Sequence, residues 1–375
     1  MQSDHILLIG GGHAHVAVLA DWIKHGLPSK RATLLTPTQH LRYSGMVPGW
    51  IAGQYSRAAG TVDVATLARR AGAEVVLDKC TAIDPVTRSV QTLRSGDVSF
   101  DIASIDVGGV GQAARILGDH PQLLDVRPID AFVDHLAKQI ARLGQLTRRP
   151  AQIAVIGGGA GGAELAFALR NCRGFEIQPT IHFITGDAGL LPGFSRKVVG
   201  KVGDALSRQG IEFLGANARI EGHLIKASRT TLSDIDIIVA ATGSGAPKWP
   251  GKGGLACDAD GFIAVDAHQS SLSHPNIFAV GDVAARQDRV VPHSGVHAVM
   301  AGPILAQNLR AAAKGDVPTR IYRPRSSSLY LIATGDGGAI ASYGGFCAKG
   351  RWVGRLKRWI DKRWISKYAK LANGD

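Results

Sequence analysis

The sequence predicts an α/β protein built from two doubly wound domains, each with a parallel sheet. Three observations carry this prediction: a strand, glycine turn and helix pattern that occurs twice, further apolar runs that end in glycine, and 47 glycines gathered in short clusters. Such clusters are typical of tight strand-to-helix turns. At 375 residues the chain is long enough for two or three domains with separate cores.

The repeated pattern is a short apolar strand followed by a glycine turn. Residues 5–9 run into Gly10, Gly11 and Gly12, and residues 153–156 run into the glycine-rich segment 157–162. A helix-like apolar segment follows each turn, and a second strand follows after about 20 residues, at 32–35 and at 180–184. Two such units predict two domains that each hold a dinucleotide.

Other segments fit the same architecture. The runs 103–109 and 235–243 read as parallel strands that leave a sheet at its carboxyl edge, where ligands bind in such folds. Residues 130–142 have apolar side chains at helical spacing. This helix ends before a basic segment, 148–150, that leads into the strand of the second unit.

The two glycine turns differ at their third glycine. In this motif the glycines permit a tight bend, a close approach of the backbone to a pyrophosphate, and close helix packing. The second turn is complete at Gly157, Gly159 and Gly162, whereas His15 stands where the first turn needs its third glycine. We expect that side chain to push the helix outward or to point toward solvent or ligand. Either His13 and His15 contact a phosphate, or they fill a widened turn.

The acidic residue that usually binds the adenosine ribose is absent from both units. Thr36, followed by Pro37, ends the second strand of the first unit, and Thr185 ends that of the second. Ribose hydroxyls must then be bound by hydroxyl or backbone groups, although Asp187 lies close enough in sequence to substitute. Because no arginine stands at 185 or 186 to bind a 2′-phosphate, NADH is favoured over NADPH.

A further strand, 276–280, ends in Gly281 and Asp282. Its carboxylate can accept hydrogen bonds from the hydroxyls of a ribityl chain. Alone, this aspartate would be read as a solvated turn residue; beside two dinucleotide turns it indicates a flavin site.

Together these segments resemble the pyridine nucleotide-disulfide oxidoreductase superfamily of flavoproteins. The matching pieces are 9–12, 156–164, 241–243 and 278–282, in order over nearly the whole chain. The resemblance is closest to type II NADH dehydrogenases, sulfide:quinone oxidoreductases, and the flavoprotein module fused to selenophosphate synthetase. The runs 10–15, 43–49 and 295–309 look most like the last group.

The resemblance implies an NAD domain inserted into an FAD domain. It divides the chain into an FAD domain at 1–113 and 244–318, an NAD(P)H domain at 114–243, and a C-terminal domain at 319–375. The residues expected at the FAD are Gly10, Gly11, Gly12, His13, Ala14, His15, Thr36, Pro37, Gly108, Gly281, Asp282 and Gly295. Those expected at the NADH are Gly157, Gly159, Gly162, Thr185 and Gly243.

The resemblance also implies catalytic candidates. Glu164 matches a glutamate near the flavin and nicotinamide of type II dehydrogenases, where it orders the nicotinamide or relays protons. His293 and His297 lie near the expected flavin edge, where they either donate hydrogen bonds to it or pack as ordinary polar residues.

Three departures from the family concern the electron acceptor. No CxxC is present, which argues against disulfide reduction. Cys172 and Cys347 are the only pair for sulfide chemistry, and their surroundings match poorly. Gly295 replaces the quinone-site glutamine of type II dehydrogenases. The leading interpretation is an NADH dehydrogenase-like enzyme that reduces a membrane quinone; the alternatives are a sulfide or persulfide oxidoreductase and a flavin-binding partner module without NADH turnover.

The C-terminal segment carries much of the positive charge. The formal net charge is +13, and residues 349–375 hold nine Lys/Arg and two Asp. Between 351 and 371 the apolar and basic residues alternate at the spacing of an amphipathic helix, which is typical of a helix at a membrane surface. The stripe could instead dock on the protein's own core or form a homodimer. No aromatic-basic motif supports nucleic-acid binding.

The sequence also carries expectations about location. Residues 1–9 lack a signal-peptide pattern, and the chain has no run of 18 apolar residues. We therefore expect a cytoplasmic protein, peripheral on the inner face of the cytoplasmic membrane. No metal site is expected, because the four cysteines are widely spaced.

Overall fold

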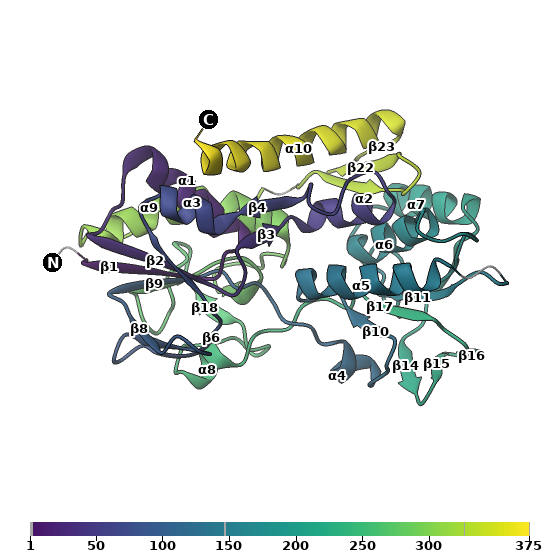
Figure 1. Ribbon diagram of the computed structural model, residues 1–375, viewed down its shortest axis with the longest axis horizontal. Helices are drawn as coiled ribbons and strands as arrows, with labels where there is room; N and C mark the ends of the chain where they lie inside the picture. The colour runs from purple at the N-terminus through teal and green to yellow at the C-terminus, as the bar shows by residue number, and fades with distance from the viewer. Residues whose placement is uncertain (1–2, 146–147, 326, 375) are drawn as a thin grey trace.

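The computed structural model describes residues 3–145, 148–325 and 327–374, and its centre is two parallel sheets (Figure 1). The first has the strand order β19-β9-β1-β2-β5. Its strands are β1 (His5–Ile9), β2 (Arg31–Thr36), β5 (Glu74–Leu77), β9 (Ile102–Ile105) and β19 (Ile277–Ala279). All four pairings are parallel. β1 and β9 are buried along their whole length, as expected for parallel strands covered on both faces.

The second sheet has the order β10-β17-β11-β12-β13 and repeats the first in four of its strands; its edge strand β10 comes first in the chain, whereas β19 comes last. Its strands are β10 (Leu123–Asp125), β11 (Gln152–Ile156), β12 (Thr180–Ile184), β13 (Glu212–Leu214) and β17 (Ile237–Ala240). All of them lie between β9 and β19 in the chain, so this sheet is inserted into the fold of the first. The predicted α/β class with two doubly wound units is confirmed; the residue boundaries given above remain a prediction.

Helices cover both sheets, and each glycine turn leads into one of them. The helices are α1 (His13–His25), α2 (Val47–Ile51), α3 (Val64–Arg70), α4 (Ala113–Leu117), α5 (Ile129–Leu143), α6 (Ala160–Arg170), α7 (Arg196–Arg208), α8 (Trp249–Lys252), α9 (Gly295–Ala313) and α10 (Arg351–Asn373), with single 3-10 turns at Ser44–Met46 and Gly281–Val283. α1 packs on α9, where Gly302 lets the helices approach: a Cβ there would lie 2.8 Å from the Ala14 carbonyl oxygen.

Small sheets flank the two large ones. Antiparallel sheets are formed by β3 (His40–Arg42) with β4 (Thr61–Asp63), by β6 (Cys80–Asp84), β7 (Ser89–Thr92) and β8 (Asp97–Ser99), and by β14 (Ala218–Glu221), β15 (Leu224–Ala227) and β16 (Thr230–Leu232). β18 (Ile263–Val265) pairs in parallel with β20 (Ala284–Arg286). β21 (Tyr330–Ala333), β22 (Ala339–Tyr343) and β23 (Phe346–Gly350) form the C-terminal meander.

The predicted C-terminal helix is present as α10, which lies across both halves of the molecule (Figure 1). It contacts α1, α3 and β4 of the first half and packs on β21, β22 and β23. One face of α10 docks on the protein's own core through Val353 and Tyr368, which are buried, and through Trp364 and Leu371. The alternative in which the apolar stripe packs internally therefore holds for this face.

The other face of α10 carries exposed aromatic side chains. Trp352 is 51% exposed and Trp359 is 58% exposed. Across the described residues, no helix combines the length and the hydrophobicity that are needed to cross a membrane.

Candidate functional site

A cavity of about 660 Å³ follows the carboxyl edge of the first sheet. This volume lies within the usual range of ligand sites. The predicted residues that line it are Gly10, Gly11, Gly12, His13, Thr36, Pro37, Gly108, Asp282 and Gly295. Two helix N-termini therefore border one cavity, because α1 begins at His13 and α9 at Gly295. N–H groups at such termini favour an anion, and at α1 those of Ala14 and His15 already donate to the carboxylate of Asp106.

The first glycine turn is held tightly against the end of β9. Gly10 has a φ of +94°, and a Cβ there would lie 2.4 Å from the backbone oxygen of Asp106. A Cβ on Gly12 would lie 2.3 Å from Cγ of Asp106. Both glycines are thus required by Asp106, which sequence reasoning missed. The available signal was an acidic residue at the end of a buried apolar strand.

His15 fills the space beneath this turn and does not line the cavity. The side chain is fully buried. Its Nδ1 lies 2.6 Å from the Gly10 carbonyl oxygen and its Nε2 lies 2.8 Å from Oγ of Ser104. Because a carbonyl only accepts, Nδ1 carries the proton and Nε2 accepts from the serine. The expectation that this side chain points toward solvent or ligand does not match its position; of the two alternatives, the structure favours a filled turn.

Ala14 and His13 take different positions in the same turn. Ala14 is buried, and its N–H donates to Asp106. His13 lines the cavity, and its ring packs against Tyr43 and Trp364 at centroid distances of 5.7 and 5.5 Å. Burial, with the nearby charge of Arg127, lowers the pKa of His13 to about 4. This ring is therefore neutral at physiological pH and offers no charge to a phosphate.

Asp282 lies in the wall of the cavity with half of its carboxylate unused. Its Oδ2 accepts a hydrogen bond of 2.8 Å from Nη2 of Arg127, while its buried Oδ1 has no partner among the described residues. A buried acceptor without a partner is costly, so a ligand hydroxyl there would be favourable. These residues suit FAD: the glycine turn and the helix N-termini at this cavity would hold its pyrophosphate, and Oδ1 of Asp282 would accept a hydrogen bond from a ribityl hydroxyl. Arg127, which precedes α5, is a second residue that sequence reasoning missed.

The second glycine turn has the geometry of a nucleotide site. A Cβ on Gly157 would lie 2.2 Å from the Ala241 carbonyl oxygen, and one on Gly162 would lie 1.8 Å from the Gly157 carbonyl oxygen. Both positions therefore need glycine for packing. A Cβ on Gly159 would meet no atom within 4 Å. Of these three glycines, only Gly159 faces open space, where backbone can approach a pyrophosphate.

The predicted ribose residues of the second unit are already hydrogen bonded. Thr185 is buried, and its hydroxyl lies 3.3 Å from the Leu214 carbonyl oxygen. Asp187 is exposed, and its Oδ1 accepts from the backbone N–H of Asn217 at 3.2 Å. Gly243, with a φ of +91°, has no atom within 4 Å of its Cβ position. Asp187 is thus the exposed carboxylate that follows Thr185 in the chain, and its Oδ2 also accepts from Nδ2 of Asn217.

Glu164 belongs to a largely buried ionic cluster with Lys357 and Asp361 of α10. The ammonium Nζ of Lys357 lies 3.1 Å from Oδ2 of Asp361 and 4.0 Å from Oε1 of Glu164, and it donates to the Gly45 carbonyl at 3.0 Å. Oε1 of Glu164 also accepts from the N–H of Ala333 at 2.9 Å. Three distant parts of the chain thus meet at one ammonium group.

The charges in this cluster do not balance. Burial raises the pKa of both carboxylic acids, and Lys357 opposes that rise in each of them. Burial works against the charged form of Lys357, but the two carboxylates outweigh it and raise its pKa. The site is therefore an ammonium shared by two carboxylates, one of which binds a proton more readily than usual. Lys357 and Asp361 were read from sequence only as members of an amphipathic helix.

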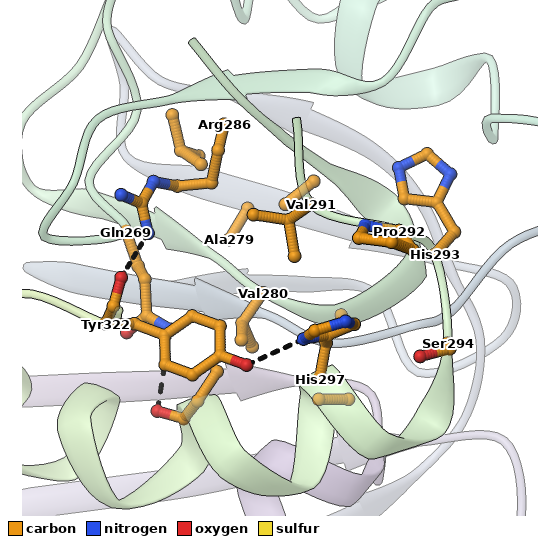
Figure 2. A pocket seen from close by; sticks show the side chains of 15 residues that line it. Gln269, Ala279, Val280, Arg286, Val291, Pro292, His293, Ser294, His297 and Tyr322 are labelled. Atoms are coloured by element: carbon orange, nitrogen blue, oxygen red, sulfur yellow. Dashed lines mark hydrogen bonds between the residues drawn. The ribbon is translucent and has the colours of Figure 1, made fainter. Parts of the chain in front are cut away.

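His297 lines a second, small pocket beside the N-terminus of α9 (Figure 2). Its Nδ1 lies 2.8 Å from the Tyr322 hydroxyl, and Nη1 of Arg286 donates to the Tyr322 backbone oxygen at 2.9 Å. The pocket, about 40 Å³ with Gly281 in its lining, has room for a water molecule. His293 also lines it, but its exposed ring turns away from this pair and packs on Phe262 at 4.1 Å. Neither histidine lines the large cavity.

The cysteines form no reactive pair in the described part of the chain. All four are free. Cys172 is buried beyond the C-terminal end of α6, and burial raises its pKa, so its thiol is a poor nucleophile. α6 is 11 residues long, which places this thiol about 16 Å along the helix from the glycine turn.

Comparisons with known proteins agree with this geometry. Residues 4–302 match the pyridine nucleotide-disulphide oxidoreductase family. The chain is 25% identical over 295 residues to Ferroptosis suppressor protein 1 of Taeniopygia guttata, which covers 74% of this chain and 72% of that protein.

Solved structures share the fold at low identity. Sulfide:quinone oxidoreductase from Aquifex aeolicus is similar with a TM-score of 0.77 and 19% identity, covering 98% of this chain and 92% of that chain. NDH2 from Plasmodium falciparum in complex with NADH is similar with a TM-score of 0.76 and 16% identity. The match covers 98% of this chain and 99% of that chain. With the family match over most of its length, the chain belongs to the pyridine nucleotide-disulphide oxidoreductase family and is a flavoprotein that uses FAD and a nicotinamide dinucleotide.

Proposed function

We propose that this enzyme transfers electrons from NADH to a quinone at a membrane surface. The observation that carries the proposal is the buried cluster of Glu164, Lys357 and Asp361, where α6, α10 and the Gly45 turn meet. When bound, FAD supplies the redox chemistry, accepting a hydride from NADH and delivering electrons to the second substrate. The protein's own part is to position both substrates and to manage protons.

The reduction of a quinone by NADH needs a proton donor, and the cluster of Glu164, Lys357 and Asp361 can supply one. Oxidation of NADH to NAD⁺ provides two electrons and one proton, whereas reduction of a quinone to a quinol takes two electrons and two protons. One further proton must come from the protein or from water. A carboxylic acid whose pKa is raised by burial, such as Glu164 or Asp361, suits this role near neutral pH.

The preference for NADH rests on the second glycine turn. Asp187 is the exposed carboxylate beside Thr185, and it can accept hydrogen bonds from a ribose 2′-hydroxyl but repels a 2′-phosphate. Neither 185 nor 186 is an arginine. NADH dehydrogenase-like turnover is therefore favoured over use of NADPH.

A membrane quinone is supported by the outer face of α10. Trp352 is exposed about one turn from the exposed Arg355, and Trp359 is exposed about one turn from the exposed Arg363. Arg363 lies over the Trp359 ring at 5.3 Å. Aromatic rings interleaved with cations are what a peripheral helix needs at an anionic lipid surface, where each cation contributes roughly 1 kcal/mol. The helix is anchored to the core by its opposite face.

Sulfide oxidation is less well supported. That chemistry needs cysteines beside the flavin, and Cys172 lies at the far end of α6 from the glycine turn. A flavin-binding module without NADH turnover would not need the open space beside Gly159, where the backbone can approach a nucleotide pyrophosphate.

Anaerobic stopped-flow absorbance tests the proposal. We expect NADH to bleach the flavin faster than NADPH, sulfide to leave it oxidised, and a short-chain quinone to restore the colour. Bleaching by sulfide but not by NADH would favour the sulfide oxidoreductase. Absence of bleaching by either donor would favour the partner module. Glu164→Gln is expected to slow the quinone step with flavin content retained; unchanged reduction and turnover would remove its role.

A further inference from the structure

The internal repeat supplies a matched comparison for the FAD turn. Asp106 and Ala241 hold equivalent positions: the N–H of Asp106 donates to the Ile9 carbonyl at 2.8 Å, and that of Ala241 donates to the Ile156 carbonyl at 2.7 Å. In each unit the first glycine packs against the backbone oxygen of that residue. The backbones therefore correspond, while a carboxylate in one unit replaces a methyl group in the other.

The two units also differ at the third glycine position of the turn. Gly162 of the second unit corresponds to His15 of the first, whose ring ties the Gly10 carbonyl to Ser104 of β9. The FAD turn thus contains two added polar side chains that the NADH turn lacks. Both are buried, so neither is an incidental surface substitution.

Asp106 occupies the place at which a helix N-terminus usually attracts a ligand anion. Its Oδ2 accepts from the N–H of Ala14 at 2.8 Å and from the N–H of His15 at 3.1 Å. Asp106 also lines the 660 Å³ cavity beside Gly12. An ionised Asp106 would therefore repel the pyrophosphate of FAD, which is a dianion at the same helix end.

The surroundings make Asp106 the group that changes charge near neutral pH. Burial raises its pKa to about 7; the two N–H donors oppose the rise and Asp282 adds to it. The other groups that face it are His13 and His15, whose pKa burial lowers to about 4, and the Arg127–Asp282 ion pair. His297, near Asp282, has a pKa lowered by burial.

We propose that FAD binding is coupled to the uptake of one proton by Asp106, which stays a neutral acid beside the bound pyrophosphate. The inference rests on the assignment of the large cavity to FAD. It makes Asp106 a positioning residue that sets how tightly the flavin is held as a function of pH. The proton comes from solvent, and no bond to the flavin forms or breaks.

The sign of the effect follows from linkage. Protonated Asp106 binds the dianion more tightly, so the Kd for FAD is constant below the pKa of the free carboxyl. Above it, Kd rises about tenfold for each pH unit until the pKa of the FAD-bound form is reached. Release of FAD is thus favoured at alkaline pH.

Dilution of the full-length holoprotein tests the proposal. Fluorescence of released FAD, measured over a dilution series from pH 6 to pH 9, gives Kd at each pH. We expect Kd to rise at least tenfold between pH 7 and pH 9 in the wild type and less than about twofold in Asp106→Asn. A Kd that stays flat in the wild type, or that rises equally in Asp106→Asn, would overturn the proposal.

A charge control uses a carboxylate in the lining of the same cavity. Asp130 also lines the cavity, but it is partly exposed and paired with Arg42 at 2.8 Å. Asp130→Asn removes one negative charge without touching the turn, so Kd should keep its wild-type slope with pH. If Asp130→Asn abolished the rise of Kd with pH while Asp106→Asn kept it, the assignment of the titrating group to Asp106 would be wrong.

Infrared spectroscopy gives a readout that needs no variant. At pH 8 the holoprotein should show the C=O band of a protonated carboxylic acid, and that band should shift when aspartate is labelled with carbon-13. Loss of the band after FAD is released at pH 8 is expected, because the free carboxyl ionises there. Absence of any such band in the holoprotein would contradict the proposal even if Asp106→Asn failed to fold.

Discussion

The ring of Tyr43 stacks on the ring of Trp364, with centroids 4.7 Å apart and planes inclined by 22°. Tyr43 belongs to the segment between β3 and the Ser44–Met46 turn, whereas Trp364 belongs to α10, more than 300 residues later. Trp364 also packs on Tyr368 at 4.9 Å and on His13, which lines the 660 Å³ cavity. The C-terminal helix is therefore part of the structure that supports this cavity.

Trp364→Ala should destabilise the protein through this contact. Removing the ring leaves a gap between α10 and the first domain, at a cost of about 2–4 kcal/mol in the free energy of unfolding. Trp359→Ala, on the exposed face of the same helix, should change it by no more than about 0.5 kcal/mol. Denaturant titration of both variants checks this; equal losses would mean that α10 is not docked as described.

Membrane binding should depend on the other face of α10. The double variant Trp352→Ser and Trp359→Ser removes two exposed rings without touching the docked face. We expect it to bind anionic vesicles at least tenfold more weakly than the wild type, with binding that also weakens as salt rises.

The matched control for vesicle binding is Phe213→Ser. Phe213 is an exposed ring, 44% accessible, on β13 of the second sheet. Vesicle flotation should give wild-type recovery for this variant. Equal recovery of all three proteins would show that α10 does not contact lipid.

The second glycine turn offers a pair of variants that separate folding from binding. Gly162→Ala places a methyl group against the backbone carbonyl of Gly157, so it should lower the melting temperature. Gly159→Ala meets no atom and should melt like the wild type, yet raise the KM for NADH because backbone can no longer approach the pyrophosphate. An unchanged KM in Gly159→Ala would place the nucleotide elsewhere.

Local pattern was enough to predict much of the fold. The strands at 5–9 and 180–184 and the helix at 130–142 are all present, because hydrophobic periodicity and glycine turns are set by nearby residues. The cavity residues in the glycine turns and at Asp282 could be placed for the same reason. Each follows directly from a strand that leaves a parallel sheet.

Contacts between distant segments could not be predicted. Nothing near Glu164 indicates that Lys357 will lie 4.0 Å away, and the basic residues of α10 looked alike until packing buried one of them. The two alternatives for the His15 side chain could not be decided from sequence, because Ser104, which bonds its Nε2, comes from a strand 89 residues away. A substitution in a motif, such as His15 at the third glycine position, can be interpreted only when the residue that contacts it, here Ser104, is known.

Lys357→Met should expose the imbalance of charges in the cluster. Without the ammonium, Glu164 and Asp361 are left buried and unpaired, which costs about 3–5 kcal/mol of stability at pH 8. The loss should shrink toward pH 5, because acids whose pKa is raised take up protons as the pH falls. Lys362→Met, an exposed lysine on the same helix, is the control and should be nearly neutral at both pH values.

Stability should also report the protonation of Asp106. Its pKa of about 7 in the folded protein exceeds the ordinary value for aspartate, so its favourable contribution is complete near pH 4 and is lost as the pH rises toward 7. We expect the free energy of unfolding of the wild type to fall by about 2–4 kcal/mol relative to Asp106→Asn between pH 4.5 and pH 8. Bound FAD acts in the same direction, because it raises this pKa further. Denaturant titrations at four pH values decide the matter: parallel curves for the two proteins would mean that Asp106 is ionised in the folded state throughout, and that its two N–H donors outweigh its burial.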